Sequence, residues 1–292
     1  MNRIKGILYA AVSSSTFGLA PFFSITLLLA GFSAFEVLSY RWGVASIVLI
    51  VFGWLSGCNF RLAGKDWGVV FLLSLLRAVT SFSLIIAYQN IASGVASTIH
   101  FMYPLAVALA MMFFFREKKS LLVILVVLMS LLGAALLSLG ELEAKSGNTM
   151  VGLVAACVSV FSYAGYIVGV RTTRAVQINS TALTCYVMGL GTIFYLIGAY
   201  CTSGLQLVSD GYTWLIILGL ALPATAISNI TLVQAIKYAG PTLTSILGAM
   251  EPLTAVVIGV FVFKELFTVN SAVGIILILL AVSIVVFRRQ KS

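Results

Sequence analysis

The chain has very few charged residues. Only 9% of its 292 residues are charged, whereas 61% are hydrophobic and the mean hydropathy is +1.15. A soluble domain carries about 25% charged residues. The composition therefore excludes a soluble globular protein and also a disordered chain, which would be rich in charge. The sequence predicts a protein that uses the lipid bilayer as its solvent.

Cysteine, histidine and catalytic motifs are equally scarce. The four cysteines show no CxxC spacing, so neither a disulfide scaffold nor a metal site is predicted. There is one histidine and no P-loop, GxSxG or HExxH motif. We therefore expect no catalytic residue, cofactor or bound metal, and no enzyme. The net charge of +9 does not indicate nucleic acid, because Lys and Arg are scattered over short loops.

Ten apolar runs have the roughly 20 residues that a helix needs to cross the hydrocarbon core. They are continuous rather than alternating in polarity, so an all-α membrane protein is favoured over a β-barrel. The first run is too long for a signal peptide, so we expect an uncleaved membrane helix. The predicted spans are 4–29, 34–56, 66–89, 94–115, 121–140, 149–170, 181–203, 212–236, 241–263 and 268–287.

Lys and Arg fall almost entirely on one side of these spans. If the N-terminus is cytoplasmic, the cytoplasmic segments hold thirteen of the 17, and the outer loops hold only Lys145 and Lys264. Arg41 and Arg77 lie inside helices. Because cytoplasmic loops carry the excess of positive charge, we predict a multi-pass protein of a bacterial inner membrane with both termini in the cytoplasm.

Two stretches of the chain repeat each other at a spacing of 148 residues. Ala92–Glu117 and Gly240–Glu265 are each long enough to cross the bilayer, and at this offset Pro104 aligns with Pro252. Each copy of the repeat would contain five helices. Because five is odd, the second copy enters the membrane in the opposite direction. Interrupted helices at equivalent places in two inverted repeats are typical of a transporter's binding site.

The predicted domains are therefore two inverted five-helix repeats, residues 1–145 and 146–292. Together with the helix exits FFFRE (113–117) and FVFKEL (261–266), the Glu251–Pro252 pair and Arg41 early in the second helix, they resemble the EamA-type, ten-helix branch of the drug/metabolite transporter superfamily. The resemblance covers nearly the whole chain.

The resemblance implies a central cavity between the repeats, lined mainly by the first, third, fourth, sixth, eighth and ninth helices. It also implies export or exchange of small metabolites. The first repeat departs from the pattern in having Tyr103 where the second has Glu251. A role for that acid therefore cannot be carried over to the fourth helix.

Three ionisable residues fall inside predicted spans. Glu251 lies about ten residues from either end of its helix, roughly 15 Å deep at 1.5 Å per residue. It is either a protonatable coupling or substrate-ammonium site, or a structural partner of an arginine. Arg77, also near the midplane, could bind a substrate carboxylate or pair with Glu251. Arg41 is shallower and could snorkel to the membrane surface.

His100 and the two prolines add further candidates. His100 could carry protons at neutral pH, or could be a hydrogen-bonding packing residue. Pro104 and Pro252 lack an N–H, so they should loosen the carbonyls of His100 and Gly248 and act as kinks or hinges.

Aromatic and small polar residues complete the candidate site. Each is also compatible with ordinary helix packing. The candidates on the predicted cavity wall are Phe17, Tyr88, Tyr103, Tyr163, Tyr166, Ser228 and Asn229.

The sequence thus predicts a secondary transporter that exports small metabolites, such as amino acids or related compounds, by alternating access. Its expected partners are the lipid bilayer, a small-molecule substrate and protons, and it would be a monomer or homodimer. The alternatives are a non-transporting membrane sensor or assembly module, and multidrug efflux within the same family. A midplane cavity would favour a transporter over the dry bundle of a sensor or assembly module.

Overall fold

The structure, a computed structural model, describes residues 2–117, 120–138, 147–202, 204–254, 257 and 268–288. All long regular elements within these residues are helices, as predicted. They are α1 (Asn2–Phe17), α2 (Ala20–Leu29), α3 (Ala34–Leu55), α4 (Trp67–Asn90), α5 (Ser93–His100), α6 (Tyr103–Phe114), α7 (Leu121–Ser138), α8 (Thr149–Thr172), α9 (Ser180–Thr202), α10 (Gly211–Ala221), α11 (Ser228–Ala239), α12 (Pro241–Leu247) and α14 (Val269–Arg288).

Short turns connect some of these helices. Gly64–Asp66 precedes α4 and Arg174–Gln177 precedes α9, and a π-helical turn, Leu222–Ile227, joins α10 to α11. The predicted boundary after residue 145, the exit at 261–266, and Lys145 and Lys264 lie outside the described residues.

The helices form a multi-pass membrane protein. Seven helical stretches of the described chain, from Ile4–Leu29 to Gly211–Ala239, are long and apolar enough to cross a membrane. Leu121–Leu136 and Ala272–Ile284 are shorter apolar helices. The remaining predicted span, 241–263, is described only in part. The ten-span, all-α prediction is therefore confirmed.

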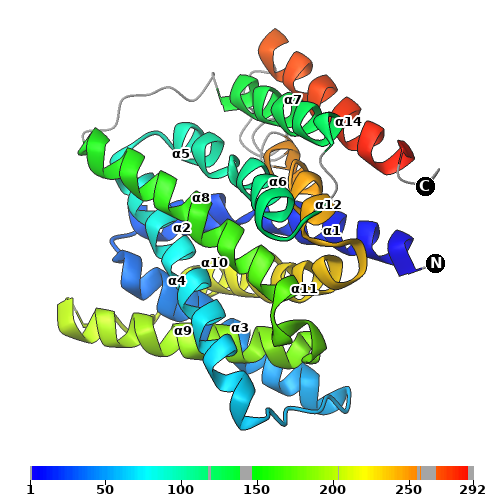
Figure 1. Cartoon of the computed structure of the whole chain (residues 1–292). Coiled ribbons are helices and arrows are strands. Elements are labelled where there is room, and N and C mark those ends of the chain that lie inside the picture. The colour runs from blue at the N-terminus through cyan, green and yellow to red at the C-terminus, as the bar shows by residue number, and fades with distance from the viewer. Residues whose placement is uncertain are drawn as a thin grey trace.

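The two repeats contact each other mainly through pairs of helices, one helix from each repeat. The most extensive contacts pair α4 with α8, α1 with α11, α3 with α9 and α7 with α14. Each pair joins one repeat to the other, and the pair α4–α8 corresponds to the pair α11–α1 when the repeats are exchanged. Figure 1 places the start of α1 and the end of α14 on one side, which we call the terminal face.

The second repeat is inverted relative to the first because successive helices alternate in direction across the membrane. The third helix of the first repeat, α4, begins at the terminal face. Its counterpart, formed by α10 and α11, begins at the opposite face and ends at the terminal face. Hydrogen bonds at both faces agree, since Arg171 Nη1 donates to the Lys237 carbonyl at the terminal face and the Asn148 N–H donates to Asn90 Oδ1 at the other.

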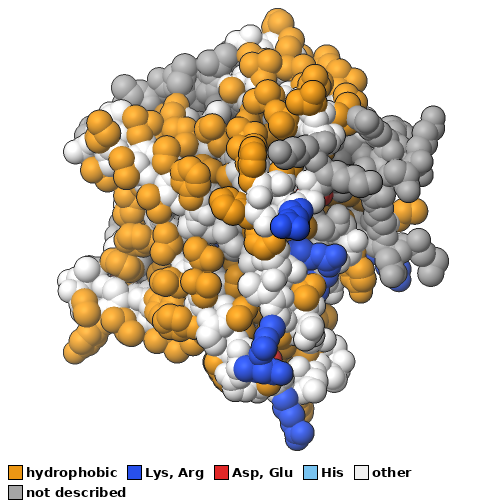
Figure 2. Space-filling view, in the orientation of Figure 1, with side chains coloured by type: hydrophobic (Ala, Val, Ile, Leu, Met, Phe, Trp, Pro, Cys, Tyr) orange, Lys and Arg blue, Asp and Glu red, His pale blue; other side chains and the backbone are white. Residues whose placement is uncertain are grey.

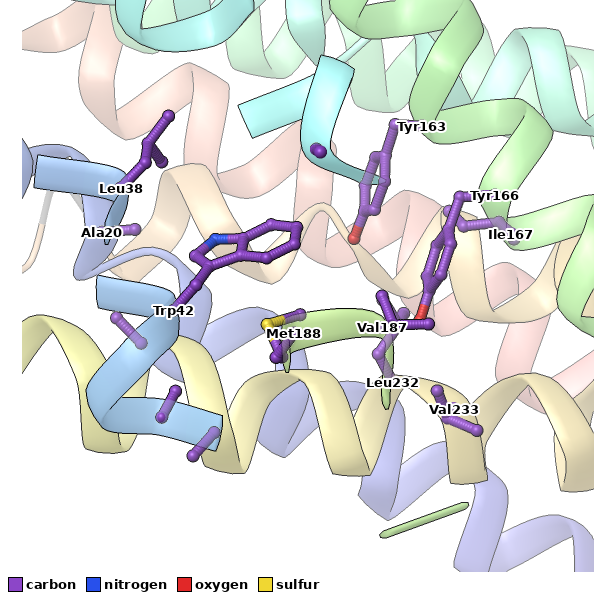
Figure 3. Packing of buried hydrophobic residues seen from close by; sticks show 14 of the residues in the cluster. Ala20, Leu38, Trp42, Tyr163, Tyr166, Ile167, Val187, Met188, Leu232 and Val233 are labelled. Atoms are coloured by element: carbon purple, nitrogen blue, oxygen red, sulfur yellow. The ribbon is translucent and has the colours of Figure 1, made fainter. Parts of the chain in front are cut away.

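Apolar side chains cover the outside as well as the core. Figure 2 shows hydrophobic groups over most of the visible face, with Lys and Arg gathered toward the terminal face. Exposed side chains such as Ile47, Phe161 and Ile193 face lipid, where their exposure carries no free-energy penalty because lipid tails are equally apolar. Inside, one of the apolar clusters contains side chains from both repeats, and Figure 3 shows part of it, including Trp42 and Val187.

Candidate functional site

Interrupted helices position the site. The first span breaks at Gly18 and Leu19, just before Pro21, and the fourth breaks at Phe101 and Met102, just before Pro104. Proline cannot donate the backbone hydrogen bond that would continue a helix. The first break was not predicted, because span 4–29 was read as one helix. Pro21 is the sequence signal that could have revealed it.

The fourth and ninth spans cross closely at their interruptions. A Cβ atom on Gly248 would lie 1.8 Å from the Tyr103 hydroxyl, so only glycine fits there. The Gly248 carbonyl, which was expected to be loosened by Pro252, accepts a hydrogen bond from the Glu251 N–H at 2.9 Å. That carbonyl is therefore less available to a ligand than the sequence suggested.

Glu251 faces Tyr103 at this crossing. The Tyr103 hydroxyl donates to Glu251 Oε1 at 3.3 Å, which joins two positions that the 148-residue repeat makes equivalent. Within the described chain, neither Arg41 nor Arg77 forms an ion pair with Glu251. The interpretation of Glu251 as the structural partner of an arginine therefore finds no support in the observed contacts.

His100 lies on the same side of the crossing. Its Nδ1 shares a hydrogen bond of 2.8 Å with Ser159 Oγ, while Nε2 is buried with no hydrogen-bond partner in the described residues. The ring packs against Tyr103 and Tyr163, with centroids 5.5 and 5.3 Å away. One nitrogen of His100 is thus occupied by packing and one remains unpaired.

Arg77 is a buried charged residue with several neutral contacts. It is 1% exposed, and its guanidinium donates to Asn229 Oδ1 at 3.1 Å and to Ser81 Oγ at 3.3 Å. Its Cζ lies 5.3 Å from the ring centre of Phe17 and 5.0 Å from that of Tyr163. Cation–π contact with electron-rich faces partly replaces lost hydration.

Arg41 points inward, so the snorkelling expectation is wrong. The side chain is 4% exposed, and its Nε donates to Thr225 Oγ1 at 2.7 Å while Nη2 lies 3.4 Å from the Ala224 carbonyl. Both acceptors belong to the π-helical turn, which departs from regular α-helical hydrogen bonding. The turn thus supplies Arg41 with a side-chain hydroxyl and a backbone carbonyl as acceptors.

Two hollows adjoin these groups. The larger, about 60 Å³, is lined by residues of α1, α2, α4, α5 and α7, together with Glu251 and Pro252 from the ninth span. The smaller, about 20 Å³, lies between Arg41 and Arg77. Since a water needs roughly 10–15 Å³, the first has room for roughly four to six waters and the second for one or two. Phe17, Pro21, Leu84 and Tyr88 line both.

Most of the predicted site residues meet at these hollows. Phe17 and Tyr88 line them, and Tyr163 and Asn229 contact Arg77. Ser228 does not join the cluster: its carbonyl accepts from Ser13 Oγ at 2.8 Å, which ties α1 to α11.

Sequence reasoning missed several contributors. Ser81, Thr225, Ser159 and Phe101 are ordinary residues whose roles depend on their neighbours. Only Pro223, inside the π-helical turn, offered a signal for the Arg41 partners.

Comparisons with known proteins agree with this architecture. The EamA-like transporter family matches the sequence twice, over residues 4–139 and 150–287. No curated protein matches it. A solved structure described only as "Crystal structure of protein" superposes with a TM-score of 0.78 over 97% of this chain and 96% of that one, at 17% identity. That likeness shows the fold, and the two family matches show that this chain belongs to the EamA-like transporter family.

Proposed function

We propose that this membrane transporter is a secondary transporter that exports small metabolites, such as amino acids or related compounds, from a bacterial cell. The observation that carries the proposal is the set of buried polar groups gathered around hollows where interrupted helices cross. Ionisable groups in a membrane interior are costly and usually mark a substrate or ion pathway. In this reading Glu251 senses protons or substrate charge, Arg77 holds a carboxylate, and the aromatic walls select size.

Alternating access around this site fits the sidedness of the contacts. The lining residues Pro21, Tyr88 and Ser97 belong to helix halves away from the terminal face. On the terminal side, the Thr242 hydroxyl donates to Glu117 Oε2 at 2.6 Å and closes the gap between the exit of α6 and the start of α12. We infer that the site in this state faces the side of the membrane opposite the termini.

The remaining assignments belong to the same proposal. We place the protein in the inner membrane with both termini cytoplasmic, because Arg61, Lys65, Arg171 and Arg174 all lie in or beside loops of the terminal face. We retain the division into repeats 1–145 and 146–292, protons as a partner, and a monomer or homodimer.

Uptake by reconstituted protein tests the function. Proteoliposomes containing the purified chain should take up candidate metabolites, chosen by comparing the metabolite pools of deletion and overexpression strains, faster than protein-free liposomes do. Internal unlabelled substrate should accelerate uptake of labelled substrate, since exchange is a property of alternating access. If none of these metabolites moves, and no exchange occurs under any imposed proton gradient, the sensor or assembly module becomes the better reading.

Removing the Thr242 hydroxyl should favour opening at the terminal face. Thr242→Val keeps the side-chain volume but deletes the donor to Glu117, and a hydrogen bond to a charged group contributes about 1.5–3 kcal/mol. The ratio of molecules closed at the terminal face to molecules open there should fall by roughly ten- to a hundredfold. Faster amide hydrogen exchange in α12 would report it.

Thr231→Val is the matched control. Within the described chain, the Thr231 hydroxyl donates only to the carbonyls of Ile227 and Ser228 in its own helical stretch, so exchange in α12 should stay at the wild-type rate. Equal exchange rates in both variants and the wild type would mean that the Thr242–Glu117 contact does not close this side.

A further inference from the structure

Two buried guanidinium groups, those of Arg41 and Arg77, share one small hollow. Their side chains are 4% and 1% exposed, and both line the 20 Å³ hollow next to Phe17. Their Cζ atoms lie 5.6 and 5.3 Å from the same Phe17 ring centre. An arginine does not lose its proton in a protein, so two positive charges are held together in the membrane interior.

The hydrogen-bond partners of both arginines are neutral. Arg41 donates to Thr225 and toward the Ala224 carbonyl, and Arg77 donates to Asn229 and Ser81. No described carboxylate forms an ion pair with either group. Nη1 of Arg41 and Nη2 of Arg77 have no hydrogen-bond partner in the described part of the chain. Each of the two positively charged guanidinium groups thus keeps a free N–H donor group beside the same hollow.

The charge of the site is unbalanced without a ligand. Among the described residues, Glu251 is the one carboxylate that lines either hollow, and its partner is Tyr103. Buried charges without a counter-charge are strongly unfavourable, and two like charges repel each other more in a low dielectric. An anion between the arginines would relieve both costs. Guanidinium groups fit carboxylates well because their planar donors match two oxygens at once.

The shapes of the two hollows indicate how such an anion would lie. The smaller one has room for one or two oxygen-sized atoms, which suits a carboxylate. The larger one shares Phe17, Leu84 and Tyr88 with it and extends toward Phe101 and Glu251. A carbon skeleton placed there would meet mostly apolar and aromatic surface.

We propose that the transported substrate is a small organic acid with a net negative charge, whose carboxylate binds between Arg41 and Arg77. This inference rests on the proposed transport function and narrows its substrate class. It also makes Arg41 a second carboxylate-binding residue. Amino acids with an acidic side chain should therefore bind better than amino acids that are neutral zwitterions, because the ammonium group of a neutral zwitterion cancels its one negative charge at a site that already holds two arginines.

Matched pairs of acids and amides test the proposal by equilibrium binding. Phenylacetate and phenylacetamide, succinamate and succinamide, and aspartate and asparagine differ by one charge at nearly constant volume. Binding to purified protein is measured by calorimetry and by thermal stabilisation. Hydrogen bonds between charged groups are stronger than those to a neutral amide. We therefore expect each acid that binds to have at least about tenfold higher affinity than its amide.

Variants assign the preference to the arginines. Arg41→Gln should reduce the acid-over-amide ratio at least about tenfold, whereas Arg61→Gln, which changes an exposed loop arginine, should leave it unaltered. The wild-type comparison stands even if Arg41→Gln fails to fold. Amides that bind as well as their acids, or a series in which no acid binds, would overturn the proposal. In the first case, flux of a neutral substrate in proteoliposomes would leave the transport function intact.

Discussion

Replacing Arg77 by lysine should reduce transport at least about tenfold. Lysine keeps the positive charge but has no planar fork, so it cannot reproduce the donors that reach Asn229 and Ser81 or the stacking against Phe17 and Tyr163. Losing one hydrogen bond from a charged group costs about 1.5–3 kcal/mol, which corresponds to a factor of ten or more. Initial uptake rates in proteoliposomes, normalised to the amount of reconstituted protein, measure this effect.

Arg61→Lys is the matched substitution outside the membrane interior. Arg61 is exposed in the loop before α4, so uptake by this variant should equal that of the wild type. Both variants are first compared by gel filtration and thermal unfolding in detergent, so that a folding defect is not mistaken for a lost binding group. Wild-type uptake by a correctly folded Arg77→Lys protein would remove Arg77 from the substrate site.

Replacing Glu251 by glutamine should abolish the pH dependence of transport. Glutamine preserves the volume of the side chain and can still accept the hydrogen bond from Tyr103, but it cannot bind or release a proton. If Glu251 couples protons to substrate, a proton gradient will no longer drive accumulation. Exchange of internal for external substrate should persist. Uptake measured between pH 5.5 and 8.5, with and without an imposed gradient, separates the two processes (the pH limits bracket roughly the range in which perturbed carboxyl and imidazole groups titrate).

His100 is a second ionisable group near this carboxylate in the described part of the chain. It packs on Tyr103 and Tyr163, and its Nε2 is unpaired in the described residues. His100→Gln is therefore made in parallel. If the pH profile survives in Glu251→Gln and disappears in His100→Gln, the proton-binding role belongs to the histidine.

Local features of the sequence were enough to predict the architecture. The length and continuity of the apolar runs predict membrane helices, because transfer of each run into lipid depends on its own composition. The 148-residue repeat, with Pro104 matching Pro252, predicts two copies, and the odd helix number predicts their inversion. The distribution of Lys and Arg favours cytoplasmic termini.

The composition of the site depends on contacts that no local pattern records. Tyr103 meets Glu251 only because two interrupted helices cross at Gly248. Arg41 is buried against a π-helical turn of the facing repeat, where Thr225 accepts its hydrogen bond. These partners are 148 and 184 positions apart in sequence.

The sequence by itself determined which segments enter the membrane, since that choice follows from the free energy of transferring each segment into lipid. Only the tertiary structure decided that two arginines face one hollow and that the midplane glutamate is bound to a tyrosine rather than to either of them. The physical reason is that both outcomes depend on how helices from opposite repeats pack and where they break. Packing at a crossing is set by side chains on both partners at once.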